Sequence, residues 1–191
     1  MKRLVAVVAV FVTLSAFSYV AYKWQNDAAH SQLAFTVTHL GVSEISGTFN
    51  DFNVNVTSTK ADFSDAQFEL TAKVGSIDTR VDARDNHLKS PDFFDAAKHP
   101  TLNYKSTSIK KSGRNKYKLT GNLTLHGITK PVTMDLLYKG TVQNPMSKKP
   151  VAGFQLTGAI KRSDFSVGNN FPAPMISDEV RIKADGEFLQ Q

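Results

Sequence analysis

The chain has 191 residues, 41% of them hydrophobic and 21% charged, and it contains no cysteine. This length suits one domain, and the composition excludes both a disordered chain and an integral membrane protein. The absence of cysteine excludes disulfides, thiolate metal sites and cysteine nucleophiles. The formal net charge of +6 invites a nucleic-acid interpretation, but the basic residues are scattered among acidic ones, so we expect no nucleic-acid partner.

The N-terminus has the features of an export signal. Lys2 and Arg3 are followed by an apolar run of about eleven residues and by small residues around Ala16 and Ser18. We predict a signal peptide over residues 1–18, a mature domain over residues 19–191, and export to a bacterial periplasm. The alternative is an uncleaved anchor to about residue 22 in the inner membrane, facing the periplasm, because the apolar run then approaches the roughly 20 residues that span a bilayer.

From residue 30 onward, apolar and polar residues alternate with the period of a β-strand. Eight segments show this alternation: 33–39, 52–57, 68–74, 102–106, 117–125, 132–136, 154–160 and 180–184. Since no long helix separates them, we expect antiparallel pairing. One stretch lacks alternation and predicts a short helical segment near residues 84–97, with Ser90 and Pro91 capping and opening a turn.

Eight antiparallel strands form either a closed barrel or a β-sandwich. Gly47, Gly121, Gly158 and Gly186 fall inside strand patterns, where glycine lowers stability unless a bend or a close approach requires it. A small closed barrel demands sharply bent strands. The glycines therefore favour an all-β fold, an extended eight-stranded antiparallel barrel, over the sandwich.

Phenylalanine is the most abundant aromatic residue, with 13 copies. Five lie on apolar strand faces: Phe35, Phe49, Phe68, Phe154 and Phe188. They could simply form a packed core, but an eight-stranded barrel can also hold one small ligand in its interior. Small residues such as Ala72, Gly121 and Gly158 beside large aromatics favour a tunnel. A chain of about 20 carbons would gain roughly 16 kcal/mol there, before the costs of association.

Catalytic and metal-binding motifs are missing from the sequence. The five histidines are His30, His39, His87, His99 and His126, and none has the spacing of a metal motif, so we predict no metal site. No nucleophile motif or phosphate loop is present, and the acidic residues show no recognisable acid–base pair. We therefore predict no catalytic residue and no cofactor, and a binding protein rather than an enzyme.

Four strings of residues, in order along the mature chain, resemble the YceI-like polyisoprenoid-binding proteins. They lie within residues 30–49, 84–100, 121–132 and 162–165. The resemblance implies a lipocalin-like barrel in the periplasm, with the tail of a long-chain isoprenoid lipid inside it, and often a homodimer. Two positions depart from the family pattern: Asn86 and Ser166 stand where aspartate and glycine are usual.

The resemblance also implies a ligand site. The apolar strand faces and the two adjacent phenylalanines of the non-alternating stretch would contact the isoprenoid tail: Phe35, Val37, Phe49, Phe68, Leu70, Phe93, Phe94, Tyr104, Leu123, Leu125, Phe154 and Leu156. Arg84, His87 and Lys89 are candidates for contact with a polar head group. The alternative is that this stretch plugs one end of the barrel, with Arg84 pairing a carboxylate.

The leading hypothesis is a periplasmic carrier that holds a polyprenyl lipid or an isoprenoid quinone and makes transient contact with a membrane. A second hypothesis is a stress-response barrel with a filled core that acts through a protein partner on its surface. A third is an enzyme that acts on an isoprenoid.

Overall fold

The computed structural model describes residues 20–191, so the predicted signal peptide lies outside the described residues. In this part of the chain the strands are β1 (Tyr22–His39), β2 (Ser43–Phe49), β3 (Phe52–Ser58), β4 (Gln67–Lys73), β5 (Ile77–Asp78), β6 (Thr101–Gly113), β7 (Lys116–Leu125), β8 (Ile128–Gln143), β9 (Pro150–Lys161) and β10 (Glu179–Gln190). The helices are α1 (Asp82–Lys89) and the 3-10 turns η1 (Val74–Ser76) and η2 (Arg162–Phe165). No helix within residues 20–191 is long and apolar enough to cross a membrane.

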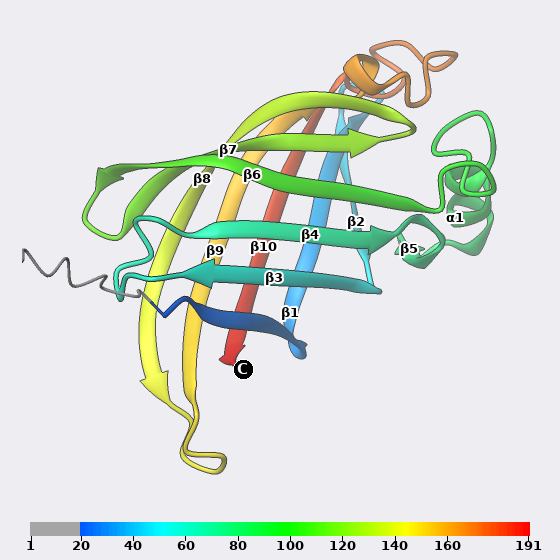
Figure 1. The fold of residues 1–191 in the computed structure, drawn as a ribbon. Helices are drawn as coiled ribbons and strands as arrows, with labels where there is room; N and C mark the ends of the chain where they lie inside the picture. Colours follow the sequence, from blue (N-terminus) through cyan, green and yellow to red (C-terminus); the bar gives the residue numbers. More distant parts are fainter. Residues whose placement is uncertain (1–19) are drawn as a thin grey trace, which may run out of the picture.

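Eight of the strands close into an antiparallel barrel (Figure 1). The sheet runs β10-β9-β8-β7-β6-β4-β3-β1, and β1 also pairs with β10, which joins the two edges. Each of the eight alternating segments lies on one strand of this ring. The predicted all-β eight-stranded barrel is therefore confirmed, and the sandwich is excluded.

One edge of strand β1 pairs with β10, and the opposite edge is long enough to pair with two other strands. Tyr22–Gln25 pairs with β3, and Ala34–His39 pairs with β2. β2 in turn pairs with the two-residue strand β5. The alternation pattern does not delimit β2 or β5, which lie outside the closed ring and near α1.

The non-alternating stretch forms one helix followed by turns. α1 begins at Asp82, two residues before the predicted segment, and has acidic residues in its first turn and basic residues in its last, as the helix dipole favours. Ser90 follows the helix as its C-cap instead of opening a new helix. Its carbonyl accepts the backbone N–H of Phe93 at 3.1 Å, so a single turn is present where Ser90 and Pro91 predicted one.

Two clusters of buried side chains occupy the two halves of the barrel. One centres on Phe63 and Phe154, and the other lies between the strands, α1 and the segment 162–176. Tyr104 packs against both clusters. Residues of both clusters line the cavity described next, whereas Phe63 and Tyr117 of the first cluster do not.

Candidate ligand-binding cavity

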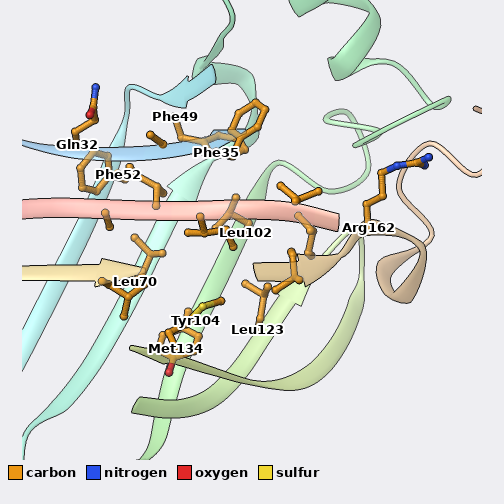
Figure 2. Close-up of a pocket in the computed structure, with 18 of the residues that line it drawn as sticks. Gln32, Phe35, Phe49, Phe52, Leu70, Leu102, Tyr104, Leu123, Met134 and Arg162 are labelled. Atoms are coloured by element: carbon orange, nitrogen blue, oxygen red, sulfur yellow. The ribbon is translucent and has the colours of Figure 1, made fainter. Parts of the chain in front are cut away.

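The barrel holds a cavity of about 420 Å³. Its walls are formed almost entirely by apolar side chains from the inward faces of the ring strands, several of which point into a common space in Figure 2. All twelve predicted tail contacts line this cavity, from Phe35 on β1 to Leu156 on β9. Their contact with a ligand stays a prediction.

The small residues do not create the cavity, so that part of the prediction is wrong. Ala72, Gly121 and Gly158 are absent from the cavity wall. A Cβ atom at position 121 would lie 2.5 Å from the Tyr104 ring, because Tyr104 covers the glycine. Met134 covers Gly158 in the same way. These glycines permit close approach of a neighbouring side chain and open no space.

One end of the barrel is closed by the loop between β3 and β4. Its Phe63 is 1% exposed and packs against Trp24, Tyr138 and Phe154, with ring centroids 4.9 to 5.4 Å apart. Phe63 adopts a left-handed backbone conformation, with φ of 57°, which is rare for a bulky residue. Burial of the ring therefore holds the loop in place, and any opening of the cavity must lie elsewhere.

The other end of the cavity is covered by two segments that meet. Phe93, from the turn after α1, stacks on Phe171 with ring centroids 4.9 Å apart and an interplanar angle of 12°. His87 packs edge-on against both rings. Figure 1 shows α1 and the segment that follows η2 (orange) at this end. The stacked rings of Phe93 and Phe171 thus separate this end of the cavity from solvent.

The predicted head-group residues separate into two positions. Arg84 and His87 line the cavity, whereas Lys89 lies with Asp85 and Asn86 in a different depression, between α1 and residues 75–78. Positions 84 and 87 share one helix face, and position 89 points away from it. The departure from the family pattern at Asn86 therefore lies away from the cavity.

Arg84 has no carboxylate partner among the described residues, contrary to the alternative prediction. Its Nε donates to Thr79 Oγ1 at 2.8 Å and its Nη2 donates to the Thr79 carbonyl at 2.7 Å. Thr79 in turn donates its backbone N–H to Asp85 at 2.9 Å. This network fixes the guanidinium and leaves Nη1 without a hydrogen bond to residues 20–191.

Arg162 is a cavity residue to which the sequence assigned no role. It is 7% exposed, and all its N–H groups donate to backbone carbonyls of the segment 167–177. Figure 2 shows the guanidinium turned away from the apolar side chains toward this segment. Because its donors are fully used, Arg162 anchors the segment that carries Phe171. The only sequence signal was its place in the string 162–165.

Tyr104 brings a hydroxyl to the middle of the apolar wall. Burial raises the pKa of Tyr104 to about 12, so the hydroxyl is neutral at physiological pH. It donates to the Leu119 carbonyl at 3.4 Å, which is a long hydrogen bond. The cavity therefore has arginine and histidine at one end and a weakly bonded neutral donor inside.

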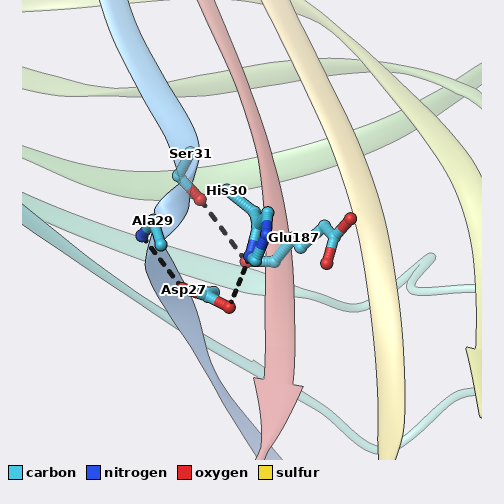
Figure 3. Close-up of polar contacts among 5 residues, drawn as sticks. All are labelled: Asp27, Ala29, His30, Ser31 and Glu187. Atoms are coloured by element: carbon cyan, nitrogen blue, oxygen red, sulfur yellow. Dashed lines mark hydrogen bonds and ion pairs between the residues drawn. The ribbon is translucent and has the colours of Figure 1, made fainter. Parts of the chain in front are cut away.

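A polar cluster on the outer surface is separate from the cavity. His30 Nδ1 lies 2.9 Å from Asp27 Oδ2, beside Glu187 of β10 (Figure 3). The hydrogen bond with Asp27 raises the pKa of His30. The cluster occupies the irregularity in pairing between β1 and β10, which lies between Asn26 and Ser31.

Known proteins are similar to this chain in both sequence and fold. The profile of the YceI-like domain matches residues 24–188. The chain belongs to the YceI-like family. Protein YceI of Salmonella arizonae is 38% identical over 182 residues, covering 95% of this chain and 92% of the relative.

YceI-like barrels are also found among solved structures. BcnA of Burkholderia cenocepacia superposes with a TM-score of 0.74 at 27% identity, covering 87% of this chain and 99% of that protein. A polyisoprenoid binding domain from Saccharophagus degradans, implicated in plant cell wall breakdown, superposes with a TM-score of 0.67 at 16% identity, covering 88% and 98%. At that identity the second likeness is one of fold. The family resemblance predicted from the four strings is confirmed.

Proposed function

We propose that this chain is an exported periplasmic protein that binds a polyisoprenoid lipid and does not catalyse a reaction on it. The observation that carries the proposal is the apolar cavity of about 420 Å³ inside a closed barrel. Its volume falls in the range of about 300 to 1,000 Å³ that is usual for ligand pockets. The Saccharophagus domain of the same fold, described as polyisoprenoid binding, supports this choice of ligand.

The energetics of burial favour a long hydrocarbon chain. Each buried CH₂ group gains about 0.8 kcal/mol, so ten carbons contribute roughly 8 kcal/mol before association costs. The aromatic wall offers flat ring surfaces, including Phe35, Phe52 and Phe154, to an unsaturated, methyl-branched chain. Leu70 and Leu123 complete the wall between these rings.

We place the polar head of the lipid at the end of the cavity near α1. Arg84 Nη1 there makes no hydrogen bond within residues 20–191, and His87 lies on the same helix face. Both groups suit an oxygen acceptor, such as the carbonyl of a quinone or the phosphate of a polyprenyl phosphate. The opposite end is closed by Phe63, so the tail points toward the aromatic cluster around Phe63 and Phe154.

The rim at the same end suits brief contact with a membrane. The backbone N–H of Leu40, at the tip of the β1–β2 hairpin, donates to the carbonyl of Met175 at 3.1 Å. Leu40, Val42 and Met175 are 55%, 84% and 46% exposed, although exposed apolar side chains are unfavourable in water. His39, Met175 and Ile176 line the cavity. We propose that this rim contacts the bilayer from which the lipid enters.

The alternatives make different demands on the structure. A barrel that acts only through a surface partner requires a filled core, which a cavity of this size does not favour. An enzyme would require chemical turnover of the bound lipid. The homodimer implied by the family stays a prediction, which the mass of the protein in solution would test.

The experiment is a calorimetric titration of protein freed of lipid by solvent extraction and refolded. The probes are geranylgeraniol and a straight-chain alcohol with the same number of carbons, both in detergent below its micellar concentration. The proposal predicts saturable binding of the prenyl alcohol and weaker binding of the straight chain. Equal binding would reduce the claim to a general lipid carrier, and binding of neither would overturn it.

A further inference from the structure

Two segments that are far apart in the sequence bring three side chains of metal-ligating types together beside the cavity. Asp95, His99 and His126 each offer one ligand atom, and these atoms lie within 4.8 Å of one another. The spacing of the histidines predicted no metal site, because His99 precedes β6 whereas His126 lies in the turn between β7 and β8. We propose that the three residues bind one divalent transition-metal ion of the Zn²⁺ class.

The local backbone explains why the first two ligands face the same way. The N–H of His99 donates to the Asp95 carbonyl at 2.8 Å, and the N–H of Lys98 donates to the same carbonyl at 3.0 Å. The two bonds form a tight turn that folds position 99 back over position 95, with Asp95 itself in a left-handed conformation, at φ of 46°. Asp95 is 6% exposed, so its carboxylate is a buried anion next to an imidazole.

The third ligand comes from the tight turn between β7 and β8. His126 and Gly127 both have positive φ, 50° and 74°, as a two-residue hairpin turn requires. The turn sits directly on His99, because a Cβ atom at Gly127 would lie 2.7 Å from its Cε1. The rings of His99 and His126 are 4.9 Å apart, between centroids.

A hydrogen bond already orients one of the two imidazoles. His126 Nδ1 lies 3.2 Å from the carbonyl oxygen of Phe165. A carbonyl only accepts, so Nδ1 carries the proton and Nε2 keeps its lone pair. Metal-ligating histidines are usually held in this way, by a carbonyl or carboxylate on the other ring nitrogen.

The donor set and the distances fit a zinc-type ion. Zinc binds imidazole nitrogen and carboxylate oxygen at about 2.0 to 2.2 Å, so tetrahedral ligand atoms lie about 3.4 Å apart. Rotation of the three side chains would bring the ligand atoms, which lie within 4.8 Å of one another, to that separation. Lys98 is the present partner of Asp95, at 3.0 Å. The Lys98 side chain is 75% exposed, so it can move away from the carboxylate when an ion binds.

Binding would fasten the covering loop to the barrel. Asp95 follows Phe93 and Phe94, both of which line the cavity, and His126 follows the cavity residue Leu125. An ion held by both segments would tie the loop to the β7–β8 turn. The inference rests on these three side chains and is independent of the identity of the lipid.

The test is titration of the tag-free, chelator-treated protein with ZnCl₂ by calorimetry, and with CoCl₂ by visible absorption. We expect one ion per chain, a Co²⁺ spectrum with imidazole ligation, and slower amide exchange over residues 93–99 with Zn²⁺. His99→Ala and His126→Ala should each weaken Zn²⁺ binding by more than the roughly 10–100-fold of an outer-shell change.

The surface cluster of Asp27, His30 and Glu187 supplies the matched control, because it is the other candidate group among the described residues. His30→Ala should leave the affinity unchanged. If an alanine variant does not fold, as judged by circular dichroism, Asp95→Asn replaces it. Absence of saturable binding, binding that survives both histidine substitutions, or loss of binding in His30→Ala would each overturn the proposal.

Discussion

Phe63 packs edge-on against Phe154, with ring centroids 4.9 Å apart and an interplanar angle of 88°. This contact joins the loop between β3 and β4 to the inner face of β9. Phe154 in turn packs edge-on against Phe68 and Phe188. The aromatic cluster closes one end of the barrel, so the cavity has its entrance at the end near α1.

Removal of the Phe63 ring should therefore cost more stability than an average substitution. Phe63→Ala leaves an unfilled space in the aromatic cluster, and we expect it to lower the free energy of unfolding by about 3 to 5 kcal/mol. Met146→Ala is the control, since Met146 is 92% exposed, and it should change stability by less than about 0.5 kcal/mol. Urea denaturation measures both. Equal stabilities would show that the loop does not close the barrel.

The same loop should respond to acid through Asp65. Burial alone would raise the pKa of this carboxyl, but hydrogen bonds from Ser58 and Thr59 lower it to about 2 from 3.8. The stabilisation is therefore present above about pH 4 and is lost as the pH falls toward 2. We expect Asp65→Asn to cost about 1 kcal/mol at pH 7, after allowance for solvent screening.

Denaturation of the parent protein and of Asp65→Asn between pH 2 and 7 tests this dependence. The difference between the two unfolding free energies should shrink on acidification. A difference that stays constant over this range would mean that the carboxylate is not linked to folding.

Ligand capacity should depend on the space beside Ala184. This residue of β10 lines the cavity, so Ala184→Phe places a ring in the lumen. We expect at least a tenfold loss of prenyl-alcohol affinity in calorimetry, with the β-sheet spectrum retained. Ala159→Phe is the matched control, because Ala159 is exposed on β9. If the two variants bind equally well, the ligand does not occupy the barrel interior.

Ser166 is strained, and glycine should relieve the strain. It has φ of 56° and ψ of 28°, which glycine adopts at no steric cost. We expect Ser166→Gly to stabilise the protein by about 0.5 to 1 kcal/mol, seen as a higher melting temperature. Ser112→Gly, in strand β6, should do the reverse. A lower melting temperature for Ser166→Gly would show that the Ser166 side chain contributes more than its backbone costs.

The sequence predicted the barrel because every ring strand contains a stretch with one apolar and one polar face. β5 has two residues, too few to alternate, and β2 has Gly47 between Ile45 and Phe49 on its apolar face, which shortens the apolar pattern. Local patterns show which face of a strand is apolar, but they do not show which neighbour fills a gap. The expectation for Gly121 and Gly158 failed for that reason, since Tyr104 and Met134 approach from other strands.

Site residues were predictable where the family strings or strand faces contain them. Lys89 could have been separated from Arg84 and His87 by helix periodicity, once α1 was known to begin at Asp82. The role of Arg162 depends on carbonyls distributed over residues 167–177, which no spacing reveals. The meeting of His99 with His126 likewise follows from the barrel and not from the local sequence.

The central claim is that the barrel carries an isoprenoid lipid. The most direct test is native mass spectrometry of the mature protein purified from a periplasmic extract, followed by solvent extraction and identification of its cargo. The account predicts one prenyl lipid per chain. A protein that is recovered from the periplasm without lipid, and that also refuses added quinones and prenyl phosphates, would contradict it.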